Sequence, residues 1–192
     1  MIEIRVIDKA AAADIHLPNE PFALTGRMVP SLQNGVWDYG IEPFAPADVG
    51  EMCFPDEDYD FDAMSQDCVF VGAYDGDVCV GLAIWQKEWH RYLYLYDLKV
   101  NRARRGHGVG SMLIAHGLSL ARTLGKRGLY TVGQDNNLNA CRFYLKQGFR
   151  IGGFNNRVYD GTSQAGKADI YFYLDLAPDT ELPSDQAEKG TE

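Results

Sequence analysis

The residues with the clearest potential for ligand chemistry form one glycine-rich loop. It reads Arg104-Arg105-Gly106-His107-Gly108-Val109-Gly110-Ser111 and lies between a β-like run and an amphipathic helical pattern. Glycines let the backbone approach a ligand closely, and a helix start presents free N–H groups at the positive end of the helix dipole. Arg102, Arg104 and Arg105 add positive charge to an otherwise acidic chain. The loop therefore predicts a phosphate site, and the alternative interpretation is a glycine-rich turn with solvated arginines.

Two common phosphate-binding loops do not match this segment. A nucleotide triphosphate loop needs Gly-Lys followed by Ser or Thr after four spacer residues, and the chain has no such sequence. A Rossmann site needs its glycines after the first strand and an acidic residue about 20 residues further on. Here the loop comes late and is followed by the basic stretch Gly125-Lys126-Arg127-Gly128. The sequence therefore does not favour a nucleotide triphosphate loop or a Rossmann dinucleotide site.

The surrounding hydrophobic pattern predicts the strands that position the loop. Alternating and β-rich runs predict strands at residues 2–7, 22–29, 35–41, 68–74, 78–85, 92–100, 128–134, 150–159 and 168–176. Asn34-Gly35 and Asp75-Gly76-Asp77 separate consecutive runs, which is typical of β-hairpins.

Two helices are predicted among the later strands. Apolar residues at three-to-four spacing predict a helix over residues 109–124, with Gly125 as its C-terminal glycine. A shorter helix runs from Asn137, which can cap it, to Gly148. This order predicts an α/β protein with a mixed, mostly antiparallel sheet flanked by helices. We expect a single domain over residues 1–177 and a disordered tail over residues 178–192, which are mostly polar or small.

Composition and charge limit the possible partners. The 192 residues are 46% hydrophobic and carry a net charge of −9, so we do not expect a nucleic-acid surface. Between Met28 and Gln86 there are twelve acidic residues and no Lys or Arg, whereas the other residues are mildly basic. Such a chain could bind a cationic ligand on one side and an anionic ligand on the other. The alternative is a solvated acidic loop around residues 55–62.

Sequence patterns for membranes, disulfides and metals are missing. No apolar run approaches the roughly 20 residues that a membrane span needs, and the N-terminus lacks the regions of a signal peptide. The four cysteines form no C-x-x-C pair and have no matched histidine spacing. We therefore expect a soluble cytoplasmic protein with reduced thiols, no membrane partner and no metal site.

Two motifs resemble a known family. Arg105-x-x-Gly108-x-Gly110, followed by Asn137-x-x-Ala140-x-x-Phe143-Tyr144-x-x-x-Gly148-Phe149, resembles the GNAT superfamily of acetyl-coenzyme-A-dependent N-acetyltransferases. Within it, the chain is most similar to streptothricin acetyltransferases, in the segments Pro18-Asn19-Glu20-Pro21-Phe22, Trp89-His90-Arg91-Tyr92, Gln134-Asp135-Asn136-Asn137 and Ala168-Asp169-Ile170-Tyr171-Phe172-Tyr173. The resemblance implies the GNAT acyl-CoA N-acyltransferase fold and acetyl-CoA as cofactor.

The resemblance also implies how the cofactor is held. The diphosphate of coenzyme A would bind the main chain of Arg105, Gly106, His107, Gly108, Val109, Gly110 and Ser111. The pantetheine arm would pair with Leu98, Lys99 and Val100 as an additional strand, and Asn137 would bind it from the other side. One N–H of the strand end would polarise the thioester carbonyl, an interaction worth about 3 kcal/mol where it has been measured.

Tyr144 and Asp97 are the candidate catalytic residues. By the resemblance, Tyr144 is the general acid, which a phenol with a pKa near 10 can be at neutral pH; the alternative is a core aromatic residue. The base is less clear, because Tyr96 and Val132 stand where related enzymes have glutamates. We expect Asp97 to be the base through water, although in a regular strand it points to the opposite face from Tyr96. The acidic loop and Tyr96 are the other candidates.

These features predict acetylation of a primary amine on a cationic small molecule, above all the β-lysine amine of streptothricin, which gives antibiotic resistance. We expect the acceptor to contact Asp56, Asp58, Asp60, Asp62, Trp89 and Tyr96. Two alternatives stay open: the same chemistry on a polyamine or a peptide N-terminus, and a non-catalytic acyl-CoA-binding module. The sequence does not determine the oligomeric state, and a homodimer is compatible with it.

Overall fold

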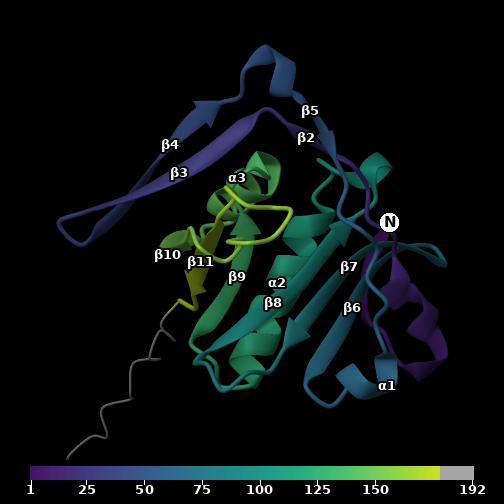
Figure 1. Cartoon of the computed structure of the whole chain (residues 1–192). Coiled ribbons are helices and arrows are strands. Elements are labelled where there is room, and N and C mark those ends of the chain that lie inside the picture. Colours follow the sequence, from purple (N-terminus) through teal and green to yellow (C-terminus); the bar gives the residue numbers. More distant parts are fainter. Residues whose placement is uncertain (178–192) are drawn as a thin grey trace, which may run out of the picture.

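A seven-stranded sheet with the order β1-β6-β7-β8-β9-β11-β10 forms the centre of the protein (Figure 1). The computed structural model describes residues 1–177, so the tail predicted at 178–192 lies outside the described residues. The strands are β1 (Ile2–Val6), β6 (Cys68–Asp75), β7 (Val78–Gln86), β8 (Tyr92–Val100), β9 (Gly128–Gln134), β10 (Arg150–Asn155) and β11 (Asp169–Asp175). Among these seven strands of residues 1–177, β8 and β9 are the one parallel pair, which confirms the mixed, mostly antiparallel sheet.

Two smaller sheets and several short helices surround the central sheet. In one small sheet β2 (Phe22–Leu24) pairs with β5 (Gly50–Met52); in the other β3 (Gly26–Gln33) pairs with β4 (Val36–Pro43). The short helices are η1 (Lys9–His16), η2 (Pro46–Asp48), α1 (Phe61–Met64) and η3 (Arg102–Arg104). Figure 1 shows the β3–β4 ribbon extending beyond the sheet at the upper left.

Both predicted hairpins form where the turn residues indicated. Asn34 and Gly35 have φ angles of +50° and +78°, as a two-residue hairpin turn requires, and Gly76 has φ +63° between β6 and β7. The strand predicted at 22–29 is wrong as one unit, because β2 and β3 belong to different sheets. The strand predicted at 150–159 ends at Asn155, and a loop follows it.

Two longer helices cover one face of the sheet. Helix α2 (Val109–Thr123) ends before Gly125, which has φ +64°, and α3 (Leu138–Lys146) is capped by Asn137, whose Oδ1 accepts from the Ala140 N–H at 3.2 Å. Both predicted helices are therefore confirmed. Their apolar sides share one core with Trp85 and Phe172 of the sheet.

A second, smaller core covers the other face of β6 and β7. Ile15 of η1 packs there with Phe70, Leu82 and Ile84, and the aromatic rings of Phe61 and Phe70 stack 5.1 Å apart. The central strands are thus fixed from both sides, so the end of the neighbouring strand β8 is held in place. No helix within residues 1–177 is long and apolar enough to cross a membrane.

Candidate active site

Strands β8 and β9 separate part of the way along their length and open a cavity. Their parallel pairing runs from Tyr92 opposite Gly128 to Leu95 opposite Thr131 and goes no further. Beyond that point residues 97–100 pair with β7 on one side only, and their other edge faces a cavity of about 790 Å³. An exposed strand edge offers unpaired N–H and C=O groups to an extended ligand. Leu98, Lys99 and Val100 all line this cavity, as does Asn137 at the start of α3.

The predicted phosphate loop forms another part of the cavity wall. Gly106 and Gly108 have φ angles of +79° and +85°, and Gly108 is the N-cap of α2. Since the first N–H groups of a helix have no intrahelical partner, those of residues 108–111 are available to a ligand. Gly106, Gly108, Val109, Gly110 and Ser111 line the cavity, whereas His107 does not. The His107 ring is exposed and its Nδ1 lies 2.9 Å from the Arg105 carbonyl oxygen.

A close contact explains one further glycine of the loop. A Cβ on Gly110 would lie 2.9 Å from Cζ of Phe143, which comes from α3. The two motifs that the sequence separates by about thirty residues therefore meet at this point. A side chain at position 110 would push α3 away from α2 and change the cavity between them.

The loop arginines bind parts of this chain rather than pointing freely into solvent. Arg105 donates from Nε to the Val100 carbonyl at 3.0 Å and from Nη1 to the Pro21 carbonyl at 2.8 Å. Arg104 pairs with Asp75, and Arg102 lies 3.2 Å from Glu51. The Arg105 side chain thus ties the N-terminal segment to the end of β8, while the backbone amides at the start of α2 have no partner within the helix.

Tyr144 reaches the cavity from the buried side of α3. Its side chain is 8% exposed, and its ring packs 5.4 Å from that of Phe172 and 5.6 Å from that of Phe149. Burial raises the pKa of its phenol above the ordinary value. The hydroxyl is therefore neutral at physiological pH and can donate a proton into the cavity.

Asp97 lies in the same cavity and is largely buried. Its Oδ2 accepts from the Tyr59 hydroxyl at 3.0 Å and lies 3.5 Å from Lys99 Nζ. Burial raises the pKa of Asp97, the Lys99 ammonium opposes this, and the Glu57 carboxylate adds to it. A carboxyl with a raised pKa accepts a proton more readily than an ordinary aspartate.

The expectation that Asp97 and Tyr96 point to opposite faces is wrong. Trp85 pairs with Leu95 but the preceding Ile84 pairs with Asp97, so Tyr96 is the extra residue of a β-bulge. The bulge lets both side chains contact Tyr59, whose ring centroid is 6.1 Å from that of Tyr96. Both residues line the cavity.

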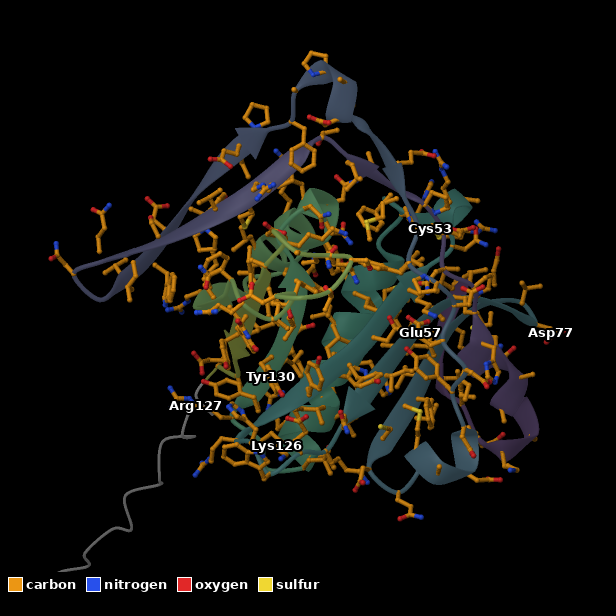
Figure 2. The ribbon with its side chains drawn as sticks, in the orientation of Figure 1. Cys53, Glu57, Asp77, Lys126, Arg127 and Tyr130 are labelled. Atoms are coloured by element: carbon orange, nitrogen blue, oxygen red, sulfur yellow. The ribbon has the colours of Figure 1, made fainter. Side chains whose placement is uncertain are left out.

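Glu57 is a site residue that the sequence analysis did not single out. Its Oε2 accepts from Lys99 Nζ and from Asn19 Nδ2, the latter at 3.0 Å. The Lys99 side chain is only 6% exposed, so its ammonium is held between Glu57 and Asp97. Figure 2 shows Glu57 near the middle of the molecule. The acidic run contained this residue, but a loop without periodicity gives no signal for which carboxylate turns inward.

The four aspartates expected to bind the acceptor have other positions. Asp56 accepts from the Asn19 N–H at 2.6 Å, Asp60 caps α1 by accepting from the Ala63 N–H at 3.0 Å, and Asp62 pairs with Lys9. Within residues 1–177, none of these three aspartates lines the cavity, and Asp58 does not line it either. The nearby loop therefore contributes Glu57 to the cavity in their place.

Trp89 also lies outside the cavity walls. Its side chain is 94% exposed in the turn between β7 and β8, and its nearest ring contact is His90 at 5.6 Å. Aromatic residues of other segments line the cavity instead, from β8 and from α3. Tyr94 lines the cavity and stacks 4.6 Å from Tyr130, which Figure 2 shows toward the lower left, away from Glu57.

The cysteines take no part in this site. All four are free thiols, and Cys141, which faces the core from α3, has its pKa raised to about 12 by burial. A thiol that stays protonated is a poor nucleophile. Within residues 1–177 no group of three or more His, Cys, Asp or Glu residues could hold a metal ion.

Comparisons with known proteins agree with this arrangement. The sequence profile of the acetyltransferase (GNAT) family matches residues 31–149. Streptothricin acetyltransferase A of Bacillus subtilis (strain 168) is 31% identical over 162 residues, which cover 83% of this chain and 92% of that protein.

Solved structures extend the similarity to the fold of nearly the whole chain. A crystal structure assigned as a streptothricin acetyltransferase from Bacillus anthracis str. Ames, in complex with acetyl coenzyme A, is 27% identical with a TM-score of 0.81 and covers 92% of this chain and 99% of that one. Nourseothricin acetyltransferase, at 24% identity and a TM-score of 0.74, shares the fold over 91% of this chain and 98% of its own. The chain therefore belongs to the acetyltransferase (GNAT) family.

Proposed function

We propose that this protein transfers an acetyl group from acetyl-CoA to a primary amine of a cationic small molecule, the β-lysine amine of streptothricin, and thereby gives resistance to that antibiotic. One observation carries the proposal. A single cavity contains the amide cradle at the start of α2, the free edge of β8, the Tyr144 hydroxyl and the buried Asp97 carboxylate. The similarity to streptothricin acetyltransferases supports this choice of acceptor.

The residues present fit the cofactor. Added side chains at Gly106 and Gly108 would meet nothing within 4 Å, so both glycines border open space where an anion can approach the backbone. The amides of residues 108–111 would hold the diphosphate, the edge of β8 at residues 98–100 would pair with the pantetheine arm, and Asn137 would bind that arm from α3. Acetyl-CoA supplies the acetyl group as an activated thioester.

Asp97 is our candidate for the group that removes the acceptor's proton. An alkylammonium with a pKa near 10.4 costs about 4 kcal/mol to neutralise at pH 7, and a nearby base offsets part of this cost. Asp97 directly follows the bulge residue Tyr96, and burial raises the pKa of its carboxyl group. Tyr59 and Lys99 fix its position. Glu57 adds a negative charge beside it, which favours a cation in this part of the cavity.

Tyr144 is our candidate general acid. Its raised pKa keeps the proton on Oη, from where it can be donated to the thiolate that departs when the amide forms. Phe149 and Phe172 hold the ring, so the hydroxyl has a defined position. A candidate base on β8 and a candidate acid on α3 therefore line the same cavity. We place the reaction in the cytoplasm, in keeping with four free thiols.

Mass spectrometry of streptothricin incubated with the protein and acetyl-CoA tests this function. We expect a mass gain of one acetyl group, with fragment ions that locate it on the β-lysine portion. Turnover only with polyamines or peptide N-termini would show that streptothricin is not the acceptor. These amines are included because Tyr96 and Val132 stand where related enzymes have glutamates. Binding of acetyl-CoA without turnover of any amine would contradict the catalytic assignment.

A further inference from the structure

The carboxylates of the active-site cavity differ in whether they already face a cation of this chain. Four of them line it: Glu20, Glu57, Asp97 and Asp169. Glu20 lies 3.6 Å from Arg105 Nη2, and both Glu57 and Asp97 face the Lys99 ammonium. Three of the four carboxylates therefore already face a cation of this chain, Glu20 facing Arg105 and the other two sharing Lys99.

Asp169 is the exception. Its Oδ1 accepts a hydrogen bond from the Tyr159 hydroxyl at 2.8 Å, and no Lys, Arg or His nitrogen of residues 1–177 lies within 4.0 Å of its carboxylate. Burial raises its pKa, with the hydrogen bond from Tyr159 opposing the shift. A partly buried carboxylate without a cation is unfavourable unless a partner arrives. Asp169 thus has one oxygen and its full charge available to a cationic ligand.

The surroundings of Asp169 form an ordered wall. The loop between β10 and β11, residues 156–168, is fixed by the hydrogen bond between Gln134 and Gln164 at 3.0 Å and by that from Arg27 to the Gly166 carbonyl at 3.2 Å. The rings of Tyr94 and Tyr159 line the same cavity. Aromatic faces beside a carboxylate attract ammonium groups.

Asp169 and Asp97 lie on strands that are not neighbours in the sheet. They come from β11 and β8, between which β9 lies in the sheet. Two strand spacings separate the backbones by about 10 Å, and the opening between β8 and β9 adds to this distance. This spacing suits a molecule with two nitrogen atoms several carbon atoms apart, one for each carboxylate.

We propose that Asp169 is an anchoring site for a second ammonium group of the acceptor, so that the enzyme selects compounds with at least two separated amines. The amine that receives the acetyl group lies at the Asp97 and Glu57 end, and the other amine pairs with Asp169 beside Tyr94 and Tyr159. This inference rests on the proposed acetyltransferase function and specifies its acceptor class.

Matched acceptors test the proposal. The ratio of kcat/KM for 1,6-diaminohexane to that for hexylamine is measured for the wild type, Asp169→Asn, Asp169→Glu and the control Asp160→Asn. Asp160 is a carboxylate of the same loop that pairs with Arg157 outside the cavity. We expect the wild type to prefer the diamine and Asp169→Asn to lower the ratio by about 10- to 100-fold, as loss of a charged hydrogen bond predicts. Asp169→Glu should recover part of the preference, and the control should keep the wild-type ratio.

Calorimetry separates failure of this site from failure of the catalytic assignment. Binding of the two amines to the protein saturated with CoA is measured directly, without turnover. Suppose that neither amine is acetylated, but that the wild type binds the diamine more tightly than hexylamine and Asp169→Asn does not. This result would support the anchoring site and contradict the catalytic function. A wild type without diamine preference, or an Asp169→Asn variant with an unchanged ratio, would overturn the anchoring site. Should Asp169→Asn not fold, the wild-type preference and the Asp169→Glu ratio decide the question.

Discussion

Replacing Gly108 by alanine tests the amide cradle at its central backbone position. Gly108 has φ +85° and is the N-cap of α2, and an added Cβ would meet nothing within 4 Å. The substitution therefore acts through backbone preference and not through a clash. For a residue with a Cβ, this left-handed conformation costs about 1–2 kcal/mol.

The effect on binding follows from the freedom of the loop. Because open space surrounds Gly108, the alanine variant can relax to a negative φ, which turns the neighbouring N–H groups away from the ligand. Binding must then restore the left-handed conformation at a cost of about 1–2 kcal/mol, which raises the Kd for CoA by about 5- to 30-fold.

Gly125→Ala is the matched control. Gly125 has φ +64° at the other end of the same helix, and a Cβ there also meets nothing within 4 Å. Calorimetric titration with CoA and thermal unfolding are measured for both variants and the wild type. We expect Gly125→Ala to keep the wild-type Kd for CoA and Gly108→Ala alone to weaken CoA binding, while thermal unfolding shows that both variants are folded. An unchanged Kd for Gly108→Ala, or equal weakening in both variants, would refute the assignment of the cradle.

Three further substitutions test the catalytic residues and the core. Tyr144→Phe keeps the ring packing but removes the acid, so kcat should fall by about 100-fold or more in steady-state assays. Since burial raises the pKa of Asp97, its basic form is lost as the pH falls through that raised value. The acid limb of the wild-type kcat/KM profile should therefore lie above an ordinary aspartate pKa and disappear in Asp97→Asn. Gly117→Ala would place a Cβ 2.2 Å from the Trp85 indole, and chemical denaturation should show a loss of about 1–3 kcal/mol. An unchanged kcat in Tyr144→Phe would contradict the general acid, and an unchanged pH profile in Asp97→Asn would contradict the base. An unchanged stability of Gly117→Ala would contradict the close packing on Trp85.

Local sequence signals predict much of the fold and the cofactor side of the site. Asn34-Gly35, Gly76 and Gly125 have the positive φ angles that their turn or cap positions require, and Asn137 caps α3 as expected. Each of these signals depends on one residue and its near neighbours, so the sequence alone is enough to place them.

The acceptor side depends on contacts between distant segments, which sequence patterns do not reveal. The β-bulge at Tyr96 reverses the expected direction of Asp97, and it arises from the register between β7 and β8. Glu57 meets Lys99 only because a loop folds over the end of β8. The acidic run indicated a cation as ligand, but Asp56, Asp60 and Asp62 bind other groups of this chain.

A crystal structure of the protein with CoA is the most direct test of the central claim. We expect diphosphate oxygen atoms within about 2.7–3.2 Å of main-chain nitrogen atoms among residues 108–111. The pantetheine arm should run along the free edge of β8 toward Tyr144. A diphosphate bound elsewhere, or a cradle left empty at saturating CoA, would contradict it.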